Sequence, residues 1–174
     1  MGSIGPSGSF NAPGAEATRR VGSFRFCPVS PPVAIVYWLA VWYVVHIPAV
    51  YGYGLDHRWA LGFEHLAFIT AGLVFWWPVL LAGHLQAVPR LAYLAAAFVL
   101  AAPVALLVAL SSSTIYPYYA TTPHLWGLSP QDDQQLGGIL MAVEQSIILF
   151  LAFSVCFMRM LSDDERRPET LGSS

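Results

Sequence analysis

The sequence predicts an all-α, polytopic membrane protein, a four-helix transmembrane bundle with both ends of the chain in the cytoplasm. Two features of composition and order predict the class. Of the 174 residues, 56% are hydrophobic and only 10% are charged, whereas a globular surface needs about a quarter of its residues charged. The apolar residues also gather in four stretches, each long enough to cross the hydrocarbon core of a bilayer.

The four predicted spans make up a transmembrane domain over residues 29–162. The first runs from Pro32 to about Tyr53 and, at about 1.5 Å per residue, reaches about 33 Å. Gly52 and Gly54 are expected to stop this helix where tyrosines suit the membrane interface. The complete set of spans is 32–53, 59–81, 91–110 and 136–161.

The segments outside the spans predict the orientation of the chain. Residues 1–28 are rich in Gly, Ser and Pro and predict a disordered cytoplasmic tail, and residues 163–174 form a second tail. Basic residues near span ends stay in the cytoplasm, and only Arg58 falls on the other side. The seven arginines on the predicted inner side are Arg19, Arg20, Arg25, Arg90, Arg159, Arg166 and Arg167.

Composition also excludes several functions. With no Lys and a formal net charge of -2, the chain has no basic face for nucleic acid, and membrane lipids are its expected surroundings. Cys27 and Cys156 are too few and too apolar in context for a disulfide framework or a CxxC metal site. We interpret both as small buried hydrophobic residues.

Four ionisable residues lie inside the predicted spans and need an explanation. They are His46, Glu64, His65 and Glu144. Insertion of a charged side chain at mid-membrane costs about 2.5 to 3.5 kcal/mol. Counted from the outer ends of the spans, all four lie roughly 8 to 12 Å deep. They therefore form one predicted layer, shared by three helices.

The layer predicts a metal site. Imidazole and carboxylate are common ligands of transition metals, and Met141, three residues before Glu144, adds a thioether on the same helix face. The hypothesis is a site of His46, Glu64, His65, Met141 and Glu144 that suits copper. The alternative is an interhelical hydrogen-bond network with a core methionine. Glu64 and His65 stand about 100° apart on a helix, which argues against one shared ion.

Other polar and aromatic residues receive structural interpretations. His57 lies in the outer loop, seven residues before Glu64 and so on the same face, and is interpreted as a solvated loop histidine, whereas His84 and His124 lie away from the layer. The run Phe75-Trp76-Trp77 predicts an aromatic belt at the interface, and Pro78 a kink. Before the fourth span, Ser129 and Pro130 predict a helix start, with Asp132 and Asp133 in its first turn. Gly137 and Gly138 predict close approach of another helix.

Several short motifs together resemble the CtaG-like cytochrome c oxidase assembly factors, over about residues 34 to 160. The matching motifs are His46-Ile47-Pro48 with Tyr51, Glu64-His65 with Gly72 and Phe75-Trp76-Trp77-Pro78, Tyr116-Pro117 with Tyr119, Gly127-Leu128-Ser129-Pro130, and Asp133-Gln134-Gln135-Leu136-Gly137-Gly138 with Met141.

The resemblance implies a non-enzymatic accessory protein of the bacterial plasma membrane that helps assemble a copper-containing cytochrome c oxidase and holds or passes copper at its outer face. It implies oxidase subunits as partners. The chain resembles the C-terminal part of typical members, so another membrane chain is expected to supply the N-terminal half. After Met141 the family often continues with an aromatic residue and then a proline, whereas this chain has Ala142-Val143-Glu144-Gln145.

Two alternatives to the assembly role stay open. One is a b-type cytochrome in which His46 and another histidine ligate haem. The other is a small structural or proton-conducting subunit whose acids gate proton movement.

Overall fold

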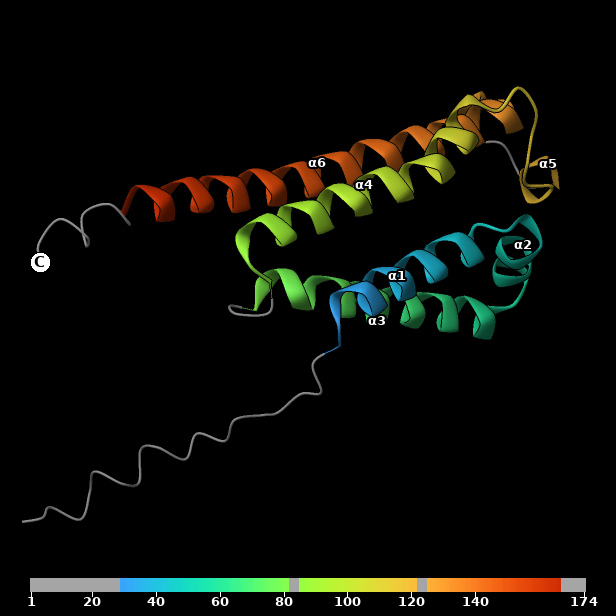
Figure 1. Ribbon diagram of the computed structural model, residues 1–174. Coiled ribbons are helices and arrows are strands. Elements are labelled where there is room, and N and C mark those ends of the chain that lie inside the picture. The colour runs from blue at the N-terminus through green and yellow to red at the C-terminus, as the bar shows by residue number, and fades with distance from the viewer. Residues whose placement is uncertain (1–28, 82–84, 122–124, 167–174) are drawn as a thin grey trace, which may run out of the picture.

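The fold is seen in a computed structural model that describes residues 29–81, 85–121 and 125–166 (Figure 1). The predicted N-terminal tail, most of the predicted C-terminal tail, Cys27, His84 and His124 lie outside the described residues.

Helices are the only regular secondary structure in the described part of the chain, which confirms the all-α prediction. The elements are α1 (Pro31–Val45), α2 (Pro48–Asp56), α3 (Arg58–Leu80), α4 (Ala87–Leu110), the short α5 (Tyr118–Thr121), the 3-10 turn η2 (Leu125–Gly127) and α6 (Pro130–Arg166).

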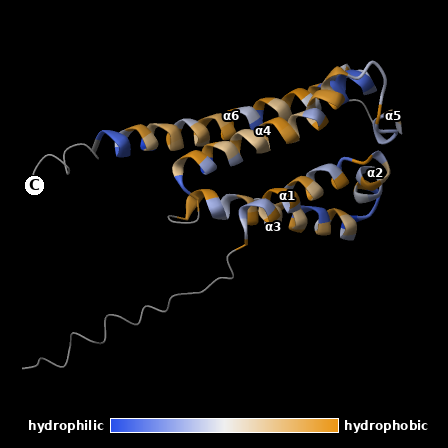
Figure 2. Ribbon diagram, in the orientation of Figure 1, coloured by the Kyte–Doolittle hydropathy of each residue, from blue (hydrophilic) through white to orange (hydrophobic). Residues whose placement is uncertain are grey.

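The helices are compatible with a multi-pass membrane bundle. Within the described residues α3, α4 and α6 are each long and apolar enough to cross a bilayer, and the bent pair α1 and α2 adds a fourth span if it is counted as one. Helix α6 has 37 residues and, at about 1.5 Å each, is longer than the roughly 30 Å hydrocarbon core. Most of its hydrophilic residues gather at its two ends (Figure 2), with Glu144 and Gln145 as exceptions between them.

The first predicted span is not one straight helix. The chain turns by 72° between α1 and α2, at His46 and Ile47. Pro48 explains the break, because proline has no N–H, clashes with the preceding turn and pushes the residue before it into extended backbone. Ile47 is accordingly extended, with φ -64° and ψ 126°. Gly52 and Gly54 lie within α2 and do not end it.

The bundle consists of two long antiparallel helix pairs. Helix α4 packs along α6, α1 packs along α3, and α1 joins the pairs by also packing on α4 (Figure 1). The core where the pairs meet contains Phe75, Val79, Tyr93, Leu94, Ala97 and Leu149. Phe75 is only 2% exposed and therefore belongs to the core, so its predicted place in an interfacial aromatic belt is wrong.

Three of the hydrogen bonds between helices go to carbonyls that lie just before prolines. The Tyr93 hydroxyl donates to the Phe75 carbonyl, before Pro78 in α3. From α1, Trp42 Nε1 donates to the Ala101 carbonyl at 3.2 Å and the Tyr43 hydroxyl to the Leu100 carbonyl at 2.6 Å, both before Pro103 in α4. Neighbouring helices thus satisfy backbone groups near positions where proline disturbs the ladder.

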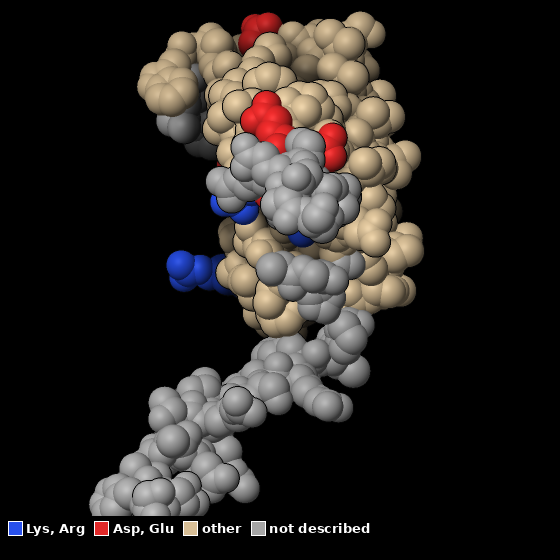
Figure 3. All heavy atoms as spheres, turned by 60° about the vertical axis from the view of Figure 1, so that its left-hand side comes forward, with Lys and Arg blue, Asp and Glu red and all other residues tan. Residues whose placement is uncertain are grey.

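The two ends of the bundle differ in what they carry. The start of α1, the link from α3 to α4 and the end of α6 lie at one end, and α2 and α5 lie at the other (Figure 1). When the first end is turned forward, acidic and basic side chains are seen near it, while most of the visible surface is uncharged (Figure 3). The start of α1 and the end of α6 thus lie at the same end of the bundle, and the side of the membrane on which this end lies stays a prediction.

The start of α6 confirms the predicted helix cap. Ser129 Oγ accepts from the Asp132 amide at 3.2 Å, and Asp132 and Asp133 lie in the first turn. The predicted close helix approach is present at Gly138, where a Cβ atom would lie under 3 Å from the Ala109 backbone of α4. A Cβ atom on Gly137 would have no neighbour within 4 Å, so Gly137 does not make such a contact.

Replacing these two glycines tests the α4–α6 contact. We expect Gly138→Ala to destabilise the bundle by about 1 to 3 kcal/mol, because the new methyl group meets rigid backbone of α4. The control Gly137→Ala is expected to be neutral or to stabilise by up to about 1 kcal/mol through helix propensity. Thermal unfolding in detergent, followed by circular dichroism, measures both; equal melting temperatures for the two variants would contradict the contact.

Reporter fusions test the predicted orientation. A fluorescent protein fused at Ser174 is expected to be bright and alkaline phosphatase at Ser174 inactive, because seven arginines favour the cytoplasmic side. At Ser113, between α4 and α5, the phosphatase is expected to be active. Active phosphatase at Ser174 would refute the orientation.

Candidate functional site

The candidate site lies at the break between α1 and α2, where His46 follows the last residue of α1. His46 Nδ1 lies 2.6 Å from the Trp42 carbonyl, and the two rings pack with centroids 4.6 Å apart. Since a carbonyl only accepts, Nδ1 of the neutral ring carries the proton. His46 Nε2 is then left with a free lone pair.

Met141 of α6 provides the second donor atom of the site. Its sulfur lies 3.4 Å from His46 Nε2, on a helix that is 95 residues away in the sequence. Neither atom has a proton to give in this tautomer, so two lone-pair donors face each other. Nitrogen and sulfur ligands at about 2.0 and 2.3 Å from one tetrahedral ion stand about 3.5 Å apart. The pair therefore fits a metal ion in donor type and in spacing.

Tyrosines and a buried glutamine fix the site from the α2 and α5 end of the bundle. The Tyr116 hydroxyl donates to the His46 carbonyl at 3.0 Å. Burial, and after it the neighbouring Tyr119, raises the pKa of the Tyr116 hydroxyl, which therefore keeps the proton that it donates. The hydroxyls of Tyr51 and Tyr119 share a hydrogen bond of 3.2 Å and tie α2 to α5.

Gln134, only 1% exposed, anchors the loop that carries Tyr116. Its Oε1 accepts from the amides of Ile115 at 2.6 Å and Tyr116 at 3.1 Å. Its Nε2 donates to the Ser113 carbonyl at 3.3 Å. The glutamines at the start of α6 thus hold the loop after α4, a role beyond the helix cap predicted for this stretch.

The structure brings together two of the five predicted metal ligands, His46 and Met141. The Glu64 carboxylate lies over Gly54 of α2, where a side chain at position 54 would collide with it. His65 is exposed, and its Nδ1 lies 2.7 Å from the Leu61 carbonyl of its own helix. Glu144 is exposed on α6. Among the described residues, no three His, Cys, Asp or Glu side chains converge on a common metal position.

A hollow of about 280 Å³ adjoins Met141 on the side away from the tyrosines. Helix α1 contributes Trp38 and Trp42, and α3 contributes Phe75 and Trp76. The α6 side is lined by Met141, Glu144, Gln145, Ile148 and Leu149. Glu144 therefore shares this groove with the thioether, although it does not approach His46 in any contact that the structure gives.

Trp42 belongs to the site but was not predicted from the sequence. An aromatic side chain in an apolar span has no polar signal, yet its carbonyl and ring both orient His46. Its position four residues before His46 could have shown it, because residues i and i+4 lie on one helix face.

Comparison with known proteins identifies the family of the chain. The family model Caa3_CtaG, described as cytochrome c oxidase caa3 assembly factor, matches residues 10–163. The chain belongs to this family. Searches of curated proteins and of solved structures found no match. The predicted resemblance to the CtaG-like factors is therefore confirmed.

Three of the stretches that carried the CtaG resemblance meet in space at this end of the bundle. The contacts described above link His46, Tyr116, Gln134 and Met141. Tyr51 joins them because its ring packs on Tyr116 with centroids 4.6 Å apart, and its hydroxyl pairs with Tyr119. Motifs from three separated stretches of a Caa3_CtaG chain thus form one local arrangement around the His46–Met141 pair.

Replacing Gln134 tests how the loop is held. We expect Gln134→Leu to destabilise the protein by about 2 to 4 kcal/mol, because two amides of the loop lose their common acceptor. Gln131→Leu, which removes one long hydrogen bond of 3.4 Å, is the control and should cost under about 1 kcal/mol. Thermal unfolding and amide hydrogen exchange over residues 111–119 measure the effect; unchanged exchange in Gln134→Leu would contradict this role.

Proposed function

We propose that this chain is a non-enzymatic accessory protein for the assembly of a copper-containing cytochrome c oxidase, and that it holds Cu(I) between His46 and Met141 at the outer face. Membership of the caa3 assembly factor family supports the accessory role. The copper role comes from the chemistry of the two facing donor atoms.

The single observation behind the copper role is the 3.4 Å approach of His46 Nε2 to Met141 Sδ, with Nδ1 engaged by the Trp42 carbonyl. A backbone carbonyl that accepts from Nδ1 fixes the imidazole tautomer and the direction of the Nε2 lone pair. Thioether ligands favour Cu(I), and imidazole suits copper as well. Mg²⁺ and Ca²⁺ prefer oxygen ligands and are a poor match for this pair.

The small number of ligands suits a carrier. Two donors leave coordination positions of the copper ion open. A ligand of the receiving oxidase subunit can occupy such a position before His46 or Met141 dissociates from the ion. Transfer is then ligand exchange without a change in the oxidation state of copper. A closed shell of four protein ligands is typical of structural metal sites.

The place of the pair also favours delivery. It lies at the bend between α1 and α2, beside the tyrosines of the α2 and α5 end of the bundle (Figure 1). With the orientation predicted from the arginines, this is the outer end of the bundle, where a copper centre that opens to the outside would be loaded.

Copper titration of purified protein tests the proposal. Wild-type protein in detergent is expected to bind about one Cu(I), measured by competition with a coloured chelator under reducing conditions. Met141→Leu keeps the side-chain volume but removes the sulfur, and should weaken binding at least about tenfold. The control Met158→Leu changes an exposed methionine at the far end of α6 and should have no effect.

Further variants and a spectrum separate the alternatives. His46→Phe is expected to abolish binding and His65→Phe to leave it unchanged, because His65 is exposed and turned to its own helix. Loss of binding in His65→Ala and Glu144→Ala would instead favour the five-residue site. Wild-type protein that takes up no copper would refute the copper role, and a Soret band in the visible spectrum would favour haem.

A further inference from the structure

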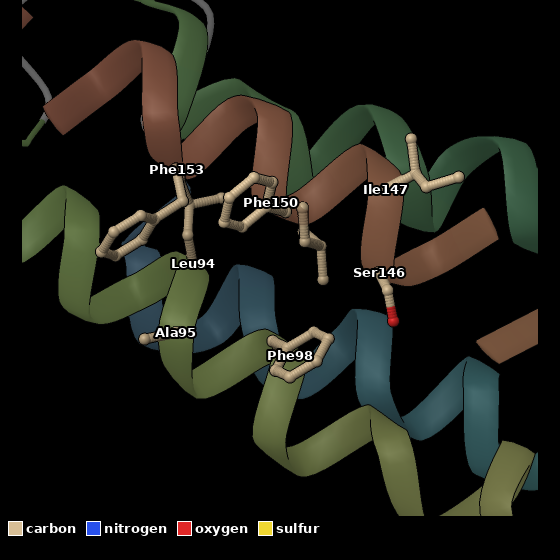
Figure 4. Close-up of a pocket in the computed structure, with 8 residues that line it drawn as sticks. Leu94, Ala95, Phe98, Ser146, Ile147, Phe150 and Phe153 are labelled. Atoms are coloured by element: carbon tan, nitrogen blue, oxygen red, sulfur yellow. The ribbon is translucent and has the colours of Figure 1, made fainter. Parts of the chain in front are cut away.

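Helix α6 borders two grooves of different chemistry. The first, about 480 Å³, lies between α4 and α6 and is lined by Leu94, Ala95, Phe98, Ser146, Ile147, Leu149, Phe150 and Phe153 (Figure 4). Its one hydroxyl, on Ser146, already donates to the Ala142 carbonyl of its own helix at 2.6 Å. Lipid chains can cover this groove without leaving any polar group in it unpaired.

The second groove is the hollow beside Met141, here called the Glu144 groove. Glu144 is the only charged residue between Asp133 and Arg159, which lie about 16 Å and 22 Å away along the helix. A charge at that depth costs about 2.5 to 3.5 kcal/mol when it faces lipid. Next to it, Gln145 Nε2 is buried without a hydrogen-bond partner among the described residues. Lipid chains can satisfy neither group.

The walls of the Glu144 groove suit a cation that has an apolar stem. Trp38, Trp42 and Trp76 line it opposite Glu144, and indole rings attract ammonium and guanidinium groups. Lipid headgroups carry such groups, but they lie at the bilayer surface and Glu144 lies near the middle of the apolar part of α6. The cation must therefore come from a molecule that crosses the membrane.

The surface of α6 next to the groove has the length and pattern of a helix contact. Ile148, Leu151, Val155 and Met158 follow Glu144 at spacings of three and four residues, which places them on one helix face. All four are between 45% and 62% exposed. The stripe extends over about 21 Å from Glu144, so it matches a second helix better than a small molecule.

We propose that the Glu144 groove docks a transmembrane helix of the oxidase that carries an Arg, Lys or His side chain at the depth of Glu144. The inference rests on the proposed assembly function for the identity of the partner and is independent of copper binding. The basic side chain pairs with the Glu144 carboxylate between the tryptophans, and the apolar stripe of α6 covers the rest of the helix.

Site-specific photo-cross-linking in cells that produce the full chain and the oxidase subunits tests the docking. A photoreactive phenylalanine replaces Ile148 in the Glu144 groove or, as a control, Phe150 in the α4–α6 groove. We expect position 148 to cross-link to a membrane-spanning oxidase segment that has a basic residue, and position 150 to cross-link to lipid.

Charge variants show whether Glu144 drives the contact. Glu144→Gln should lower the position-148 cross-link at least fivefold, whereas Asp164→Asn, which changes an exposed acid near the end of α6, should leave it unchanged. Exchanging the charges, with Glu144→Arg and an acid at the partner's basic position, should restore it. Cross-links only to lipid or to a second copy of this chain, or an equal yield in Glu144→Gln, would overturn the proposal.

The two proposals fail in distinguishable ways. Normal Cu(I) binding without a cross-link at position 148 refutes the docking site and leaves the copper role intact. A cross-link that depends on Glu144, in protein that binds no copper, refutes the copper role and supports the docking site.

Discussion

The structure depends on the need to pair every backbone polar group inside a membrane, where no water can replace a missing partner. Pro48, Pro78 and Pro103 each disturb a helix, and side chains from other segments donate to carbonyls near two of these positions. The third position is Pro48, where α1 ends. The last four carbonyls of a helix lack donors within the helix, and Trp42 carries one of them. His46 Nδ1 donates to this carbonyl. The direction of the imidazole is therefore a consequence of breaking the first span.

A second set of contacts brings the thioether to that imidazole. The α6 backbone reaches α4 closely at Gly138, and one helical turn earlier Gln134 holds the loop that carries Tyr116. Tyr116 in turn holds the His46 carbonyl. Met141 lies one turn beyond Gly138 on the same helix, so its sulfur is placed by contacts that also place its partner. The pair is thus fixed by both helix pairs of the bundle, and a shift between the pairs would separate the two donor atoms.

The sequence could predict the fold class and the family but only part of the site. Apolar stretches gave the positions of α3, α4 and α6, and Ser129 gave the start of α6. The break at Pro48 was missed because apolar length alone does not distinguish a straight span from a bent one. Depth along a helix also says nothing about the direction in which a side chain points. His46, Glu64, His65 and Glu144 are predicted to lie at one depth, yet Glu64 lies on Gly54 and His65 is exposed. Only contacts between helices distinguish them.

Helix α6 links the two proposed activities, because Met141 and Glu144 stand one turn apart on neighbouring positions of one face. A partner helix seated beside Glu144 would lie next to the groove wall that Met141 forms. Docking would hold the metal ligands of the partner close to the His46–Met141 pair, at a high effective concentration. The partner would then need no ligand that binds copper more strongly than this pair does. Weak holding by two donors and docking through the Glu144 charge are complementary on this view: the first allows copper to leave, and the second determines which protein receives it.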